Sequence, residues 1–300
     1  MTMDIAIDIT SERPVCLWDV GATLGEGALW DAAGKRVWFV DIKGRRIHCC
    51  AADGGERRSW PAPQQIGFIV PIAGGGFACA LSDGLYRFDA ASGSFSPLHP
   101  VEEDLPANRF NDGHVDAEGR LWFGSMDDGE SAASGALYRF DGAGVEQVDS
   151  GYVITNGPAI SPDARTLYHT DTLAKLVYAF DLAPDGGIDR KRVFATLGGA
   201  GHPDGMAVDA AGHLWVASFG GWRIDRFAPD GRLVGAVRFP CSNITKLAFG
   251  GGDLRTVYVT TARKGLSQFD LAQQPLAGGL FTFRSKTPGL PPHALRLEEA

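Results

Sequence analysis

The chain has 300 residues, 44% of them hydrophobic, and a formal net charge of −8 with Lys and Arg scattered along its length. This composition is too apolar for a disordered chain and lacks the clustered cations that nucleic-acid binding requires, so we expect no nucleic-acid partner. No apolar run approaches the roughly 18 residues that span a bilayer. The first residues show no signal-peptide pattern, and the five cysteines have neither metal-ligand nor disulfide spacing. We therefore expect a cytoplasmic protein without a membrane partner.

A recurring glycine-containing phrase predicts short strands along the chain. A polar residue and a glycine precede a few apolar residues, a turn, and a β-rich run containing Trp or Tyr. The copies occupy 26–40, 112–124, 156–168 and 204–216, with degenerate copies near Gly67 and Thr245. Their starts lie about 40 to 48 residues apart, which matches the repeat length of a four-stranded propeller blade.

Further strands follow each copy, for example over 135–141 and 176–181, and Asp-Gly turns then lead to a short outer strand. A β-sandwich would explain the strands but not the regular phrase. We therefore predict an all-β fold, a six-bladed β-propeller with four-stranded blades. Residues 14–20 should pair with the last blade and close the ring, because a free sheet edge invites aggregation. Residues 1–300 form a single domain in this prediction, with 1–13 as a loose N-terminal extension.

The repeat also predicts a cluster of oxygen ligands. The innermost strands of a propeller all run the same way along the channel, so residues at one repeat position converge at one mouth. Glu26, Asp112 with Asn111 beside it, Asn156 and Asp204 occupy that position, each followed by glycine except Asn111. The alternative is that these dipeptides are ordinary turns. Converging carboxylate and amide oxygens favour a divalent cation with hard oxygen ligands.

Six segments carry motifs that are specific when taken together. They are Leu-Gly-Glu-Gly at 24–27, Asn-Arg-Phe-Asn-Asp-Gly at 108–113, Thr-Asn-Gly-Pro at 155–158, Pro-Asp-Gly-Met at 203–206, and the stretches 245–251 and 254–262. Jointly these motifs resemble the SMP-30/gluconolactonase/regucalcin family over essentially the whole chain. Residues 39–43 and 168–172 are most similar to bacterial sugar-acid lactonases such as xylonolactonase, L-arabinonolactonase and gluconolactonase.

The resemblance implies a six-bladed propeller with one catalytic divalent metal ion. By motif position it implies Glu26, Asn156 and Asp204 as metal ligands, and Arg109 and Asn111 as residues that hold the lactone's oxygens. An acidic residue after the Gly-Ser-Met segment at 124–126 also contacts substrate in the family. Asp128 is the residue we assign, although Asp127 and Glu130 lie nearby and Gly129 interrupts the segment.

These assignments predict metal-dependent hydrolysis of a sugar aldonolactone to the aldonic acid in sugar catabolism, with Asp204 as both ligand and general base. Two alternatives stay open: a non-catalytic, regucalcin-type metal- or ligand-binding propeller, and a hydrolase of other lactones or esters. The metal could be Ca, Zn, Mg, Mn or Fe(II), and the sequence does not select the lactone. His202 could be a proton shuttle or a solvated loop residue, and Trp222 could stack on a sugar or cover a blade edge. The partner is a small-molecule sugar lactone, and a monomer is plausible.

Overall fold

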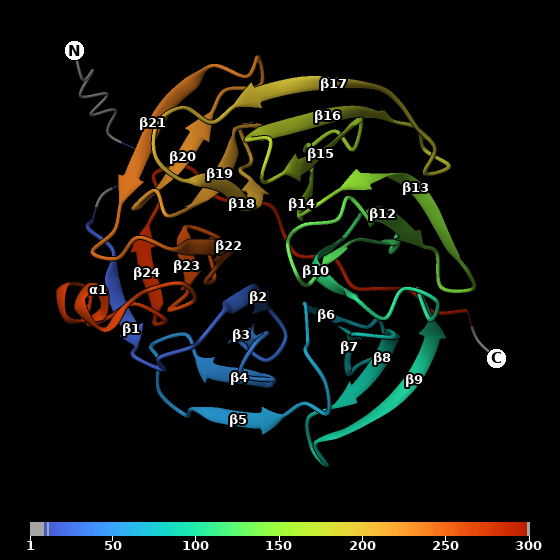
Figure 1. The fold of residues 1–300 in the computed structure, drawn as a ribbon, viewed down its shortest axis with the longest axis horizontal. Coiled ribbons are helices and arrows are strands. Elements are labelled where there is room, and N and C mark those ends of the chain that lie inside the picture. The colour runs from blue at the N-terminus through green and yellow to red at the C-terminus, as the bar shows by residue number, and fades with distance from the viewer. Residues whose placement is uncertain (1–8, 11, 299–300) are drawn as a thin grey trace.

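Six four-stranded antiparallel sheets are arranged in a ring around a central channel (Figure 1). The structure is a computed structural model and describes residues 9–10 and 12–298. The strands of each sheet follow one another from the channel outward, so each sheet is one blade. The prediction of an all-β, six-bladed propeller is confirmed.

The blades contain the following strands, given from the channel outward. The first has β2 (Gly25–Asp31), β3 (Arg36–Asp41), β4 (Arg46–Ala51) and β5 (Arg58–Pro61), and the second has β6 (Ile69–Pro71), β7 (Phe77–Leu81), β8 (Gly84–Asp89) and β9 (Ser94–Pro100). The third has β10 (Asn108–Val115), β11 (Leu121–Asp127), β12 (Gly135–Phe140) and β13 (Val145–Tyr152), and the fourth has β14 (Thr155–Ile160), β15 (Thr166–Asp171), β16 (Leu176–Leu182) and β17 (Ile188–Thr196). The fifth has β18 (His202–Val208), β19 (Leu214–Phe219), β20 (Arg223–Phe227) and β21 (Leu233–Arg238), and the sixth has β22 (Ile244–Gly250), β23 (Thr256–Thr261), β24 (Leu280–Arg284) and β1 (Val15–Trp18).

The N-terminal strand β1 closes the ring. It pairs antiparallel with β24, with Val15 opposite Thr282 and Cys16 opposite Phe281. The first blade is thereby held to the end of the chain, as the sequence predicted for residues 14–20. Of the expected N-terminal extension, residues 1–8 and 11 lie outside the described residues, whereas Ile9 is buried and Thr10 forms a bridge with Ser285.

The recurring Asp-x-x-Gly-x-Leu-Trp phrase has a packing explanation. The Asp116 carboxylate accepts backbone N–H groups of the turn that follows it, and its Oδ2 also accepts the indole N–H of the buried Trp122 at 2.9 Å. In the fifth blade, Asp209 Oδ2 accepts the indole N–H of the buried Trp215 in the same way, at 2.9 Å. One carboxylate therefore orders the turn and satisfies the buried indole together.

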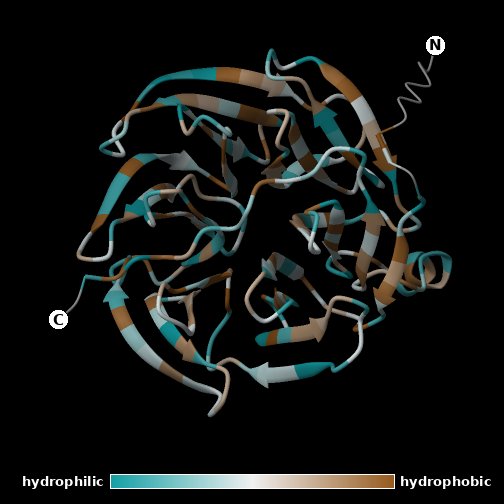
Figure 2. Cartoon of the chain, turned by 180° about the vertical axis from the view of Figure 1, so that it is seen from behind, coloured by the Kyte–Doolittle hydropathy of each residue, from teal (hydrophilic) through white to brown (hydrophobic). Residues whose placement is uncertain are grey.

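The C-terminal segment crosses one end of the channel and links several blades, as the view from behind shows (Figure 2). Its backbone hydrogen bonds join Pro288 to Ala210, Gly289 to Leu254, Leu295 to Pro71 and Arg296 to Gly119. The single helix of the described residues, α1 (Gln268–Gln273), has a Ser267 cap. Among all residues that the structure describes, no helix is long and apolar enough to cross a membrane. Because the C-terminal segment covers one end of the channel, a ligand-binding site is expected at the opposite end.

Candidate active site in the central channel

The innermost strands are irregular where the sequence predicted ligands. In β2, β10, β14 and β18 the pairing register shifts within three residues of the predicted positions, as a β-bulge does. Bulges re-aim side chains and are common next to active sites. Gly27 (φ 58°) and Gly157 (φ 78°) follow Glu26 and Asn156 in left-handed backbone that glycine adopts without strain. The four polar-Gly dipeptides therefore lie inside strands, and the ordinary-turn alternative is wrong.

Five of the predicted site residues line one cavity of about 250 Å³ at this end of the channel. Glu26, Arg109, Asn111, Asn156 and Asp204 are each at most 5% exposed. The remaining lining residues are Leu24, Glu130, Ile154, Thr172, Leu173, His202, Phe219 and Lys264. The cavity therefore has a polar buried floor and a partly apolar wall. His202 lies in this wall, with its Nδ1 3.2 Å from the Thr172 carbonyl oxygen.

The two floor carboxylates carry strongly shifted pKa values. Burial, followed by the nearby Asp204 carboxylate, raises the pKa of Glu26 well above its usual range. Burial, followed by Asp112, raises the pKa of Asp204 to about 8. In the described part of the chain, neither carboxylate has a Lys, Arg or His within ion-pairing distance. Lys246 partly opposes both shifts, but burial and the neighbouring carboxylates outweigh it, so the two groups hold protons unusually tightly when no cation is bound.

The third buried carboxylate of this region is neutralised. Asp112 lies on β10 and Lys246 on β22, in opposite blades, and their Oδ2 and Nζ atoms are 2.5 Å apart across the channel. Both side chains are at most 8% exposed. Burial still raises the pKa of Asp112, but Lys246 opposes that shift. The ion pair crosses the channel near Glu26 and Asp204, whose pKa values both of its members affect, although neither member lines the cavity itself.

A chain of hydrogen bonds orients the polar side chains around the cavity. Arg109 Nε donates to Asp128 Oδ1 at 2.9 Å, and Arg109 Nη1 donates to Asn111 Oδ1 at 2.6 Å. Asn111 Nδ2 donates to Asn156 Oδ1 at 2.9 Å, and Asn156 Nδ2 donates to Thr172 Oγ1 at 3.0 Å. Because each amide donates on one side and accepts on the other, the orientation of both amides is determined by their neighbours.

Asp128 acts on Arg109 from outside the cavity. It is not among the lining residues, and it forms ion pairs with both Arg109 and Lys43. Partial burial opposes its ionisation, but hydrogen bonds from Lys43 and Gln65 together with Arg109 lower the pKa of Asp128 below its usual value. Burial lowers the pKa of Arg109, and Asp128 counteracts that effect. Asp128 therefore keeps a buried guanidinium in place.

A divalent cation fits the floor chemically. Within the described ranges no cluster of three or more His, Cys, Asp or Glu is arranged to hold a metal, but the predicted set of Glu26, Asp204 and Asn156 contains two carboxylates and one amide. Hard cations prefer such oxygen donors. Two buried carboxylates without a cationic partner are costly unless a positive charge lies between them. The residues present therefore suit Ca²⁺, Mg²⁺ or Mn²⁺ better than a thiolate-binding metal.

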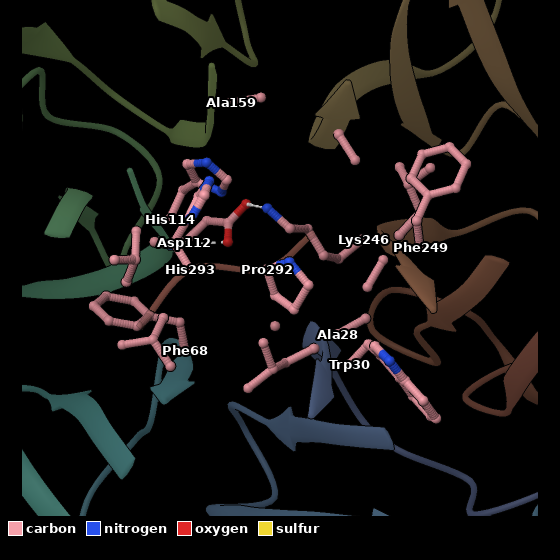
Figure 3. Close-up of a pocket in the computed structure, with 18 of the residues that line it drawn as sticks. Ala28, Trp30, Phe68, Asp112, His114, Ala159, Lys246, Phe249, Pro292 and His293 are labelled. Atoms are coloured by element: carbon pink, nitrogen blue, oxygen red, sulfur yellow. Dashed lines mark hydrogen bonds and ion pairs between the residues drawn. The ribbon is translucent and has the colours of Figure 1, made fainter. Parts of the chain in front are cut away.

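A second cavity, of about 120 Å³, is lined by residues further along the same innermost strands and by the C-terminal segment (Figure 3). Asp112 and Lys246 line this cavity, and so do the C-terminal residues Pro292 and His293. His114 on β10 lines this cavity and is partly buried, and desolvation lowers the pKa of His114 to about 3. The Asp112–Lys246 pair therefore lines this second cavity and acts electrostatically on the carboxylates of the first.

Several site residues were missing from the sequence predictions. Lys246 takes the repeat position that glycine holds in the copies at 26–40, 112–124, 156–168 and 204–216, and this substitution was a signal that could have identified it. Thr172 and Lys264 come from loops outside the repeat, where spacing offers no guide. Trp222 is 40% exposed and does not line the cavity.

The fold and the cavity define a six-bladed propeller with a buried polar cavity at one mouth of its channel. The model of the SMP-30/Gluconolactonase/LRE-like region matches residues 24–263, so the chain belongs to this family. The resemblance seen in the sequence is confirmed.

Relatives of the chain include lactonases and regucalcins. The chain is 35% identical over 282 residues to 6-deoxy-6-sulfogluconolactonase of Pseudomonas putida, covering 93% of this chain and 97% of that protein. It is 35% identical over 280 residues to L-arabinolactonase of Azospirillum brasilense, covering 91% and 92%. The solved structure of a calcium-binding protein, regucalcin, from Agrobacterium tumefaciens has a TM-score of 0.90 and 28% identity, covering 97% and 98%.

Proposed function

We propose that this protein hydrolyses a sugar aldonolactone to the aldonic acid with the help of a bound divalent cation. The lactonase relatives match more than nine-tenths of the chain, and an aldonolactone is a cyclic ester rich in hydroxyl groups. The observation that carries the metal-dependent part is the pair of buried carboxylates, Glu26 and Asp204, that line one cavity while neither forms an ion pair with a cationic side chain among the described residues. Asn156 completes the proposed ligand set.

The proposed cation would supply Lewis acidity toward the lactone carbonyl and offset the negative charge of the floor. Ca²⁺ is one candidate, since a structural relative is described as calcium-binding, and the oxygen donors suit Mg²⁺ and Mn²⁺ equally.

The chain's own residues would then handle the proton. Asp204 accepts a proton from the attacking water as general base and returns it to the ring oxygen when the ester bond breaks. Burial raises the pKa of the Asp204 carboxyl, and a bound cation would lower that pKa again. The result would be a weak base, which is sufficient for a reactive ester.

Arg109 is proposed to hold the hydroxyl groups of the substrate. Its Nε and Nη1 atoms are engaged by Asp128, Asn111 and the Phe110 carbonyl, whereas Nη2 has no partner among the described residues. A buried guanidinium with one free edge is a ready donor to a sugar oxygen. In this proposal Asn111 and Asp128 contribute by orienting Arg109, and Asn111 also orients the Asn156 amide.

We also propose that the protein is located in the cytoplasm. The five cysteines are free thiols, four of them buried, which suits a reducing compartment such as the cytoplasm. The proposed partner is a small-molecule sugar lactone.

The test is a pH-drop assay over a panel of aldonolactones, run metal-free and then with each divalent ion added back. We expect ion-dependent acid release, and Asp204→Asn should lower kcat by about 10²- to 10⁴-fold, as loss of a general base does. The matched control is Asp230→Asn, which makes the same change at a surface site. Ion-independent turnover, or an Asp204→Asn variant with the wild-type rate, would contradict the proposal.

A further inference from the structure

We propose that an ion pair between Glu130 and Lys264 selects the charge of the substrate, so that the cavity accepts uncharged lactones and rejects lactones bearing a distant anionic group. This inference rests on the proposed lactonase function and specifies its substrate class.

The pair lies at the opening of the cavity. Glu130 and Lys264 both line the cavity, and their side chains form an ion pair with each other. They are 34% and 31% exposed, in contrast to the buried floor residues. Glu130 follows β11 in the third blade and Lys264 follows β23 in the sixth, and these blades face each other across the ring (Figure 1). The ion pair therefore spans the mouth, as Asp112 and Lys246 span the channel.

Hydrogen bonds hold the backbone segments that carry Glu130 and Lys264. The loop that carries Glu130 is held by Asp127, whose carboxylate accepts hydrogen bonds from Ser131 and Ala132. These backbone hydrogen bonds lower the pKa of Asp127 to about 2. On the other side, the Lys264 N–H donates to the Thr23 carbonyl at 2.8 Å. Ordering of both segments reduces the entropy that an exposed ion pair normally loses.

Each lysine or arginine that lines the cavity already forms an ion pair with an acidic side chain. Lys264 is matched by Glu130 and Arg109 by Asp128, and the floor carboxylates would be matched by the divalent ion. An anionic substituent at the mouth could reach Lys264 only by displacing Glu130, whose carboxylate would then be unpaired above two further carboxylates. A hydroxyl substituent can accept or donate a hydrogen bond there while the ion pair stays intact.

The test compares two lactones that differ at one carbon. D-Glucono-1,4-lactone carries a hydroxymethyl group where D-glucaro-1,4-lactone carries a carboxylate. The wild-type protein should show the higher kcat/KM with the neutral lactone. Glu130→Gln frees the lysine and should raise the anionic-to-neutral ratio of kcat/KM by about fivefold or more, the size of one partly exposed charge pair. Lys264→Met should lower that ratio.

Glu146→Gln is the matched control, because Glu146 also forms an ion pair with a basic side chain, Arg139, but lies on the outermost strand of its blade. Its ratio should equal that of the wild type. A Glu130→Gln ratio within twofold of wild type, or an equal rise in Glu146→Gln, overturns the proposal. If neither lactone is hydrolysed, the proposed function fails separately. The charge selection is then read from calorimetric binding of the two corresponding lactams, which resist hydrolysis, with the same ratios expected and the same result overturning it.

Discussion

The Asp112–Lys246 ion pair across the channel makes a strong prediction about stability. Lys246→Met removes the only cation that contacts Asp112 among the described residues. Asp112 and Lys246 side chains are 1% and 8% exposed, so the remaining carboxylate stays buried. Glu26 and Asp204 lie close enough to act on one another's pKa and to be affected by Asp112. The variant therefore concentrates three carboxylates with no neighbouring cation.

The magnitude follows from the distance between the charges. At the 2.5 Å separation of Nζ and Oδ2, Coulomb's law with an effective dielectric constant of about 20 gives an attraction of about 7 kcal/mol. Desolvation of both groups offsets part of this attraction, and removing one partner of a buried pair typically costs about 3–5 kcal/mol. We expect a loss of that size from a total stability of about 5–15 kcal/mol. The loss should be larger at pH 8 than at pH 5, because protonation of the carboxylates relieves their repulsion.

Urea unfolding in the presence of a chelator measures this loss. The double variant Asp112→Asn/Lys246→Met should recover much of the stability, because it leaves no buried charge at this position. A loss below about 1 kcal/mol for Lys246→Met, or a double variant as unstable as the sum of the single variants, would refute the reasoning.

Two further predictions concern titration and packing. The raised pKa values of Glu26 and Asp204 mean that these two groups bind protons more tightly in the folded, metal-free protein than in the unfolded chain, so their contribution to stability is fully present at low pH and is lost as pH rises through about 8. Calorimetry in the presence of a chelator should show that the free energy of unfolding falls by about 1 kcal/mol from pH 7 to 8.5. Asp204→Asn should make this fall smaller, and an added divalent ion should reverse it. A free energy of unfolding that stays constant over this range would contradict the prediction. Trp215→Phe leaves Asp209 without its indole donor and should cost about 1–3 kcal/mol in urea unfolding, whereas the same change at the less buried Trp60 should cost less.

The sequence by itself determined the fold. The spacing of the repeated phrase predicted six blades because each blade is one supersecondary unit, and its length is written locally in strands and turns. The pairing of residues 14–20 with the last blade followed because an open ring would leave a free edge. The convergence of Glu26, Asn156 and Asp204 on one cavity followed from circular symmetry, since equivalent positions in equivalent strands meet at one mouth.

Only the tertiary structure decided which charges neutralise one another. Asp112 belonged to the same repeat position as Glu26 and Asp204, yet it pairs with Lys246 from the opposite blade. Asp128 pairs with Arg109 and lies outside the cavity lining, and Lys264 reaches Glu130 over 134 positions of sequence. These pairings depend on the directions in which side chains point across the channel. The local sequence around each residue does not specify which residue of another blade its side chain reaches. The repeat brings the acidic residues to the channel, and the geometry of opposite blades determines which of them has a cationic partner.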